Sequence, residues 1–210
     1  MYDFTIFMAL VDYIPVAFFG AATLLLQRDL YNKMYKGAYA LFAAGTINVF
    51  CAGFLKATWK LLYAAGICDF AALNTMFMPV QSIGFLLIGL GLLGMFGWKR
   101  KEAALLSVAP PVFSGTFVFI IMMVAGLGCL CGCLSVLAAK MKKRPAIVLF
   151  VLAFVGSMGM GYMSSHDSTS ALVNWIEQAI NTVSQGCLFA GVFMLHKNGL
   201  REWQFGTKIS

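Results

Sequence analysis

The sequence Lys140-Met141-Lys142-Lys143-Arg144 separates two long apolar stretches and carries four of the chain's 15 lysine and arginine residues. Similar clusters occur at alternate breaks between apolar stretches. Together the clusters hold 13 of the 15 basic residues: Arg28, Lys33 and Lys36; Lys99, Arg100 and Lys101; Lys140, Lys142, Lys143 and Arg144; Lys197, Arg201 and Lys208. The intervening breaks contain Asp69 and Asp167. Because cytoplasmic loops of membrane proteins carry an excess of lysine and arginine, the basic breaks are expected to face the cytoplasm and the acidic breaks the outside.

The composition also indicates a membrane protein. Hydrophobic residues make up 61% of the 210 residues and charged residues only 11%, and several apolar runs approach the roughly 20 residues that span a bilayer. We therefore expect a multi-pass protein of the plasma membrane whose partner is the lipid bilayer. The net charge of +7 is accounted for by the cytoplasmic breaks, so no nucleic-acid partner is expected.

The apolar runs and breaks predict an all-α protein with seven transmembrane helices, its N-terminus outside and its C-terminus inside. The stretch from Glu102 to Ala139 has no polar break, yet the clusters on either side of it are both basic and require an even number of crossings. Two helices satisfy this requirement, and a helix with a re-entrant segment is the alternative that the sequence leaves open. The predicted spans are Phe4–Gln27, Tyr39–Leu62, Thr75–Phe96, Glu102 to about Phe119, about Ile121 to Ala139, Ala146–Met163 and Trp175–Leu195.

Weak internal similarity suggests a duplication. A shift of 100 residues aligns the third span with the seventh and pairs Asn74 with Asn174, Gln81 with Asn181, Ser82 with Thr182 and Gly91 with Gly191. Shifts of 108 and 112 residues align the other two pairs of spans. Since transporters are commonly built from such repeats, we expect two parallel three-helix repeats at residues 1–98 and 120–197, a linker helix at 99–119 and a cytoplasmic tail at 198–210.

This arrangement of three helices, a linker helix and three helices resembles the SWEET sugar transporters and the wider PQ-loop group. In that family, asparagines on the third and seventh helices face the substrate, and Gln81 and Asn181 occupy the equivalent places here. The resemblance implies transport of a small polar solute between the two halves. The family's Pro-Gln pair is absent, and the nearest sequence is Pro79-Val80-Gln81.

Polar side chains within the predicted spans are candidates for solute binding, because polar groups in hydrocarbon are costly without a partner. Gln81 and Ser82 on the third span, and Asn181 and Thr182 on the seventh, lie at matching depths and are predicted to surround one central axis. Pro79 removes a backbone donor and is expected to kink the third span. The alternative is that these side chains only form hydrogen bonds between neighbouring helices.

Charged residues also fall within the first two spans. Asp12 and Lys56 lie about 12 Å and 9 Å below the predicted outer ends of their helices, which predicts an ion pair that is proton-linked. In the alternative, Lys56 and Lys60 extend to the outer membrane interface without pairing.

No catalytic or metal centre is expected. Cys129, Cys131 and Cys133 alternate along a helix, so they cannot converge on one ion, and only His166 and His196 occur. We therefore expect no enzyme, no cofactor and no metal. The glycine-rich stretch around these cysteines predicts close helix packing or a homo-oligomer. The function expected is a transporter or facilitator for a polar metabolite; the alternative is a non-transporting receptor, sensor or partner subunit.

Overall fold

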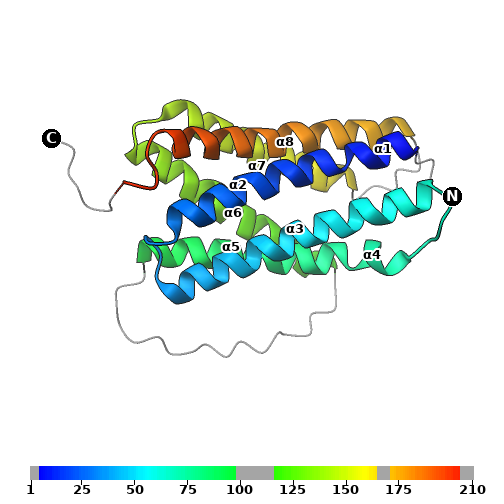
Figure 1. The fold of residues 1–210 in the computed structure, drawn as a ribbon, viewed down its shortest axis with the longest axis horizontal. Coiled ribbons are helices and arrows are strands. Elements are labelled where there is room, and N and C mark those ends of the chain that lie inside the picture. The colour runs from blue at the N-terminus through cyan, green and yellow to red at the C-terminus, as the bar shows by residue number, and fades with distance from the viewer. Residues whose placement is uncertain (1–4, 98–115, 165–170, 204–210) are drawn as a thin grey trace.

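A computed structural model describes residues 5–97, 116–164 and 171–203, and most of these residues are helical (Figure 1). The described residues contain no β-strand, in agreement with the predicted all-α class. Five helical segments, at Ile6–Leu30, Lys36–Ala64, Ala71–Phe96, Phe117–Lys140 and Ala171–Lys197, are long and apolar enough to cross a membrane. The helices are α1 Ile6–Val11, α2 Tyr13–Leu30, α3 Lys36–Ala64, α4 Ala71–Thr75, α5 Phe77–Gly97, α6 Thr116–Lys140, α7 Arg144–Ser164 and α8 Ala171–Lys197.

Six of the seven predicted spans correspond to these helices, with ends that differ by a few residues. The helices are mostly longer than predicted because backbone hydrogen bonding continues beyond the apolar residues at each end. The predicted fourth span lies outside the described residues over 102–115. Its end at about Phe119 needs correction, because residues 116–119 belong to the continuous helix α6. The seventh crossing and the orientation in the membrane remain predictions.

Two prolines explain why the first and third spans are each broken into two helices. α1 ends at Val11, four residues before Pro15, and α4 ends at Thr75, four residues before Pro79. A proline ring clashes with the carbonyl of the residue four positions earlier and cannot donate the usual helical hydrogen bond. Each break therefore falls where its proline requires it.

Glycines with a left-handed backbone end two of the long helices. Gly66 has φ of +67° and Gly199 has φ of +81°, a conformation that most other residues adopt at a cost. After α3 the amide of Ile67 donates to the carbonyl of Leu62, and after α8 the amide of Leu200 donates to the carbonyl of Leu195. These hydrogen bonds occupy carbonyls that a helix end leaves without a partner.

The helices form a closed ring in chain order, because each long helix packs against the next and α8 packs against α2. Gly89 of α5 lies against Cys129 of α6, and Gly126 of α6 lies against Phe85 of α5, so these two helices run parallel. The parallel pair α2 and α8 closes the ring. The helix triples α2–α3–α5 and α6–α7–α8 therefore follow the same alternating course. The repeat boundaries at 1–98, 99–119 and 120–197 remain a prediction.

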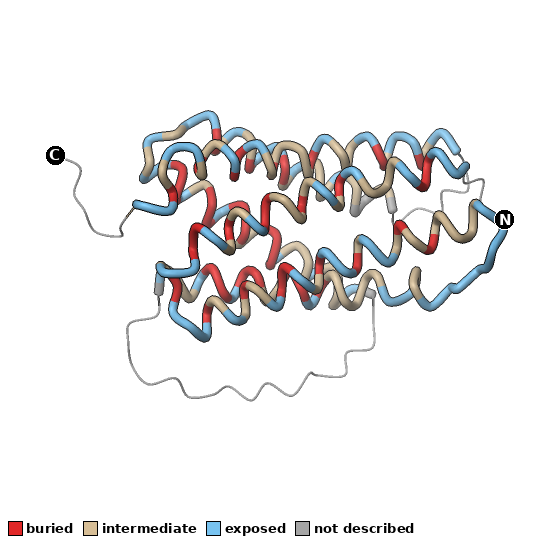
Figure 2. The backbone as a smooth tube through the Cα atoms, viewed as in Figure 1, coloured by how far each residue is buried: buried red, intermediate tan, exposed pale blue. Residues whose placement is uncertain are grey.

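The hydrophobic core lies mainly towards one end of the ring (Figure 2). We call it the basic end, because its turns at residues 31–35, 141–143 and 198–203 contain lysine and arginine. Small residues allow close packing there. Gly91 of α5, for example, lies against the backbone of Ala38 and Phe42. The fully buried large side chains of this core include Leu26, Leu30, Phe42, Ile88, Leu92, Leu130, Leu134, Leu137, Phe150 and Leu195.

A buried carboxylate–imidazole pair ties α2 to α8 at the basic end. The carboxylate of Asp29, whose side chain is 0% exposed, lies 2.8 Å from Nδ1 of His196. Nearby, Lys33 Nζ donates hydrogen bonds to the carbonyls of Arg201, at 2.8 Å, and Trp203. Burial lowers the pKa of Lys33, while the negative charges of Glu202 and Asp29 oppose this shift. These contacts hold the segment after α8 against the α2–α3 turn.

Candidate functional site

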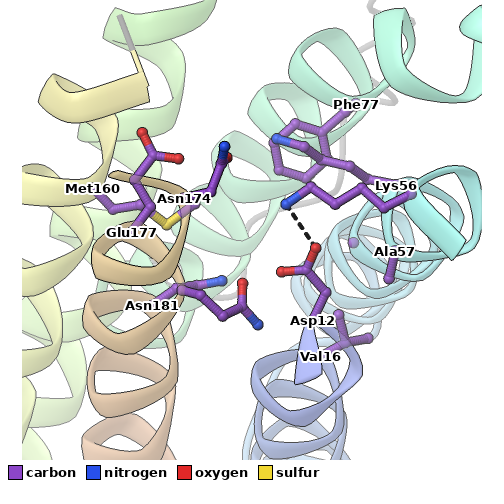
Figure 3. Close-up of a pocket in the computed structure, with 12 residues that line it drawn as sticks. Asp12, Val16, Lys56, Ala57, Phe77, Met160, Asn174, Glu177 and Asn181 are labelled. Atoms are coloured by element: carbon purple, nitrogen blue, oxygen red, sulfur yellow. Dashed lines mark ion pairs between the residues drawn. The ribbon is translucent and has the colours of Figure 1, made fainter. Parts of the chain in front are cut away.

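A polar cavity of about 70 Å³ lies between the two helix triples, towards the end opposite the basic end. Residues of α2, α3 and α5 form one wall, and residues of α7 and α8 form the other (Figure 3). The break between α1 and α2 places Asp12 at the rim, and the break before α5 places Phe77 there. The lining residues are Asp12, Val16, Gly53, Lys56, Ala57, Lys60, Phe77, Met160, Asn174, Glu177, Gln178 and Asn181.

The α8 wall is a stripe of amide side chains that continues below the cavity. Asn174, Gln178, Asn181 and Gln185 recur at steps of four, three and four residues, which places them on one helix face. Asn174 and Gln178 are buried, at 9% and 5% exposure, although they carry polar groups. The amide face of α8 therefore points into the bundle and not towards lipid.

Several polar atoms on or near this stripe have no hydrogen-bond partner among the residues that the structure describes. They are Gln178 Nε2, Thr182 Oγ1 and Gln185 Oε1 of α8, together with Ser82 Oγ of α5. A buried donor or acceptor without a partner costs about 1–3 kcal/mol. A bound polar solute or water would recover this free energy, so the stripe is suited to holding one.

The ion pair at the rim differs from the predicted one. Asp12 pairs with Lys60, at 2.7 Å between Oδ2 and Nζ, and not with Lys56. Lys56 Nζ instead lies over the ring of Phe77, 4.0 Å from its centroid. The two lysines are one helical turn apart on the same face of α3, so both reach the cavity, but Lys60 is the one that meets the α1–α2 break. Asp12 and Lys56 thus line the same cavity, and the ion pair of Asp12 in this structure is with Lys60.

The other predicted site residues separate into two groups. Asn181 lines the cavity, whereas Gln81, Ser82, Thr182 and Pro79 are not among its lining residues. Ser82 is fully buried and points into the bundle below the cavity, and Gln81 is turned about 100° from it around α5. The prediction that Gln81 faces the solute beside Asn181 therefore has no counterpart in the described cavity.

Sequence reasoning missed Asn174, Glu177, Gln178 and Lys60 as residues of the site. The signal for the α8 residues is the spacing of amides from Asn174 to Gln185, which has the period of a helix face. The signal for the rim is Pro15, whose position predicts a break that exposes Asp12.

A metal centre finds no support in the described residues, where no group of three or more histidine, cysteine, aspartate or glutamate side chains could hold an ion. The six cysteines are all free thiols. Gly126, beside Cys129, lies directly against the backbone of Phe85 and Leu86. The glycine-rich stretch of α6 therefore serves close helix packing at this position.

The rim ion pair gives a direct test of which lysine holds Asp12. Lys60→Met should lower the free energy of unfolding by about 2 kcal/mol, between the values for exposed and fully buried pairs, because Asp12 is only 12% exposed and would lose its partner. Lys56→Met, the same change one turn earlier, should cost less, about 0.5–1 kcal/mol, because it removes only the contact with the Phe77 ring. Unfolding of the purified variants in detergent measures both values. Equal losses would contradict the assignment of Lys60 as the partner.

No known protein family, curated protein or solved structure matches this chain. The long apolar helices define it as an α-helical protein of the membrane-embedded class.

Proposed function

We propose that this protein is a small transporter of the plasma membrane that moves a polar solute between its two helix triples. The observation that carries the proposal is the buried amide stripe of α8, where Gln178 Nε2 has no hydrogen-bond partner within the described part of the chain and lies at the wall of a cavity. Broken helices support it, because transporters commonly build their binding sites where helices are interrupted. Here the breaks at Asp12 and Met76 flank the cavity.

The proposal includes the predicted topology of seven crossings, an outside N-terminus and two parallel three-helix repeats. The shared course of the two helix triples supports it. Only this arrangement and the position of Asn181 support the resemblance to the SWEET group, because Gln81 does not line the cavity. With the predicted orientation, the cavity lies near the outer end and the hydrophobic core of the basic end closes the path to the cytoplasm.

That closed core also favours a second candidate, a receptor or sensor that binds a solute from outside without moving it. The core at the basic end contains large side chains that are 0% exposed, among them Phe42, Leu92, Leu134 and Phe150. A transporter must open this packing during its cycle, whereas a receptor need not. Flux therefore separates the two candidates.

The proposed solute site is tested by ligand-dependent stability. Purified protein is screened against sugars, amino acids, vitamins and polyamines, and a solute at 100 times its Kd should stabilise the fold by about 2.7 kcal/mol. Asn181→Ala should abolish this stabilisation, because it removes an amide from the cavity wall. Asn32→Ala, the same change at an exposed position of the α2–α3 turn, should retain it.

Uptake of the stabilising solute into liposomes then decides between the two functions. Uptake by the parent protein that is lost in Asn181→Ala would support a transporter. Stabilisation without uptake would favour the receptor. Stabilisation that survives Asn181→Ala would contradict the site, and a complete lack of stabilising solutes would overturn the proposed function.

A further inference from the structure

The charges on the α3 wall of the cavity are unequal. Lys56 and Lys60 both line the cavity, but the nearest wall carries one carboxylate, Asp12, which is paired with Lys60 at 2.7 Å. Among the described residues, no carboxylate lies within ion-pair distance of Lys56. Its ammonium group rests against the ring of Phe77, a contact that leaves its hydrogen-bond donors to be satisfied by other groups. The wall thus presents a cation suited to an anionic group.

The α8 wall presents a second donor to the same cavity. Gln178 is 5% exposed, and its Nε2 has no hydrogen-bond partner among the described residues. An amide donor buried in this way is stabilised by an acceptor oxygen, and more strongly by a charged one. Asn181, one turn further along α8, brings another amide to the cavity.

We propose that the cavity recognises the carboxylate group of a small solute, with Lys56 supplying the positive charge and Gln178 a hydrogen bond. The inference deepens the proposed function by naming the chemistry of the solute. A carboxylate has two acceptor oxygens and can therefore engage two separate donors at once. The apolar side chains of Val16, Ala57 and Met160 complete the lining and suit a short apolar body attached to the carboxylate.

The remaining charged group of the cavity distinguishes two sources of this carboxylate. Glu177 lies on the α8 side, across from Lys56 (Figure 3). A solute that also carries an ammonium group, such as a small amino acid, would meet a carboxylate on that wall, whereas a simple carboxylic acid would not. The shared chemistry is the carboxylate, and matched probes separate the two sources.

The test compares near-isosteric pairs on the parent protein, which avoids any dependence on variants. Propionate is compared with propionamide, and L-alanine with L-alaninamide, by thermal unfolding and by direct titration. At least one carboxylate should bind at least about tenfold more tightly than its amide, equivalent to about 1.4 kcal/mol. Binding of propionate identifies simple carboxylates, and binding of L-alanine alone identifies zwitterions. Equal responses within both pairs would overturn the inference.

Two variants then locate the carboxylate. Lys56→Gln and Gln178→Leu should each weaken carboxylate binding at least about tenfold, and Lys36→Gln, at the exposed far end of α3, should leave it unchanged. Carboxylate binding that survives both cavity variants would contradict the assigned residues. If an uncharged solute from the broader screen binds in an Asn181-dependent way while no carboxylate does, this inference fails and the proposed function stands.

Discussion

Gly126→Leu is expected to prevent folding into the structure described here. A Cβ atom at this position would lie 2.2 Å from the carbonyl carbon and oxygen of Phe85 and 2.6 Å from the amide nitrogen of Leu86. These are backbone atoms of α5, so no side-chain rotation relieves the clash. Overpacking that side chains can absorb costs about 1–3 kcal/mol, and a clash that separates two helices must exceed this range.

The loss should approach the whole stability of the protein, which for typical proteins is about 5–15 kcal/mol. Gel filtration and thermal unfolding of the purified protein in detergent report the outcome. The matched control is Gly132→Leu on the same helix, because a Cβ atom at Gly132 meets nothing within 4 Å. This control should fold, with stability unchanged or raised by up to about 1 kcal/mol from the better helix propensity of leucine. A folded, monodisperse Gly126→Leu variant would show that α5 and α6 do not approach as described.

The contrast between these glycines illustrates what the sequence can and cannot predict. The stretch from Gly126 to Gly132 predicts close packing of a helix, but it does not identify the glycine that carries the contact or the helix that makes it. That depends on α5 and α6 running side by side in the same direction, a tertiary property. The presence of the helices, in comparison, follows from apolar length alone, and six of the seven predicted spans lie where helices are found.

The predictions of the site separate in the same way. Depth along a helix can be calculated from the rise per residue, and it placed Asp12, Lys56 and Asn181 at levels that meet in one cavity. Rotation about the helix axis and the partner of each side chain cannot be calculated from depth. Lys56 and Lys60 lie one helical turn apart, and the helix break before Pro15 places Asp12 where it forms its ion pair with Lys60. The repeat alignment gives Gln81 a level on α5 and not a direction towards the cavity, and Gln81 is not among the lining residues.

The Asp29–His196 pair at the basic end provides a second large expected effect. His196→Ala should lower the free energy of unfolding by about 3–5 kcal/mol, because it leaves the fully buried carboxylate of Asp29 without its partner. Asp29→Asn should cost less, since a neutral amide can still form a hydrogen bond with the imidazole. The charge that remains, and not only the lost contact, determines the size of the effect.

A double variant separates these two contributions. In Asp29→Leu with His196→Leu, both polar side chains are replaced by apolar side chains that can join the neighbouring core of Leu26, Leu30 and Leu195. Replacing both members of a buried pair in this way is often neutral or stabilising, so the double variant should recover most of the stability that His196→Ala loses. Thermal unfolding in detergent compares the stability of all three variants on one scale. If the double variant is as unstable as His196→Ala, the loss arises from packing around α2 and α8 and not from an isolated carboxylate.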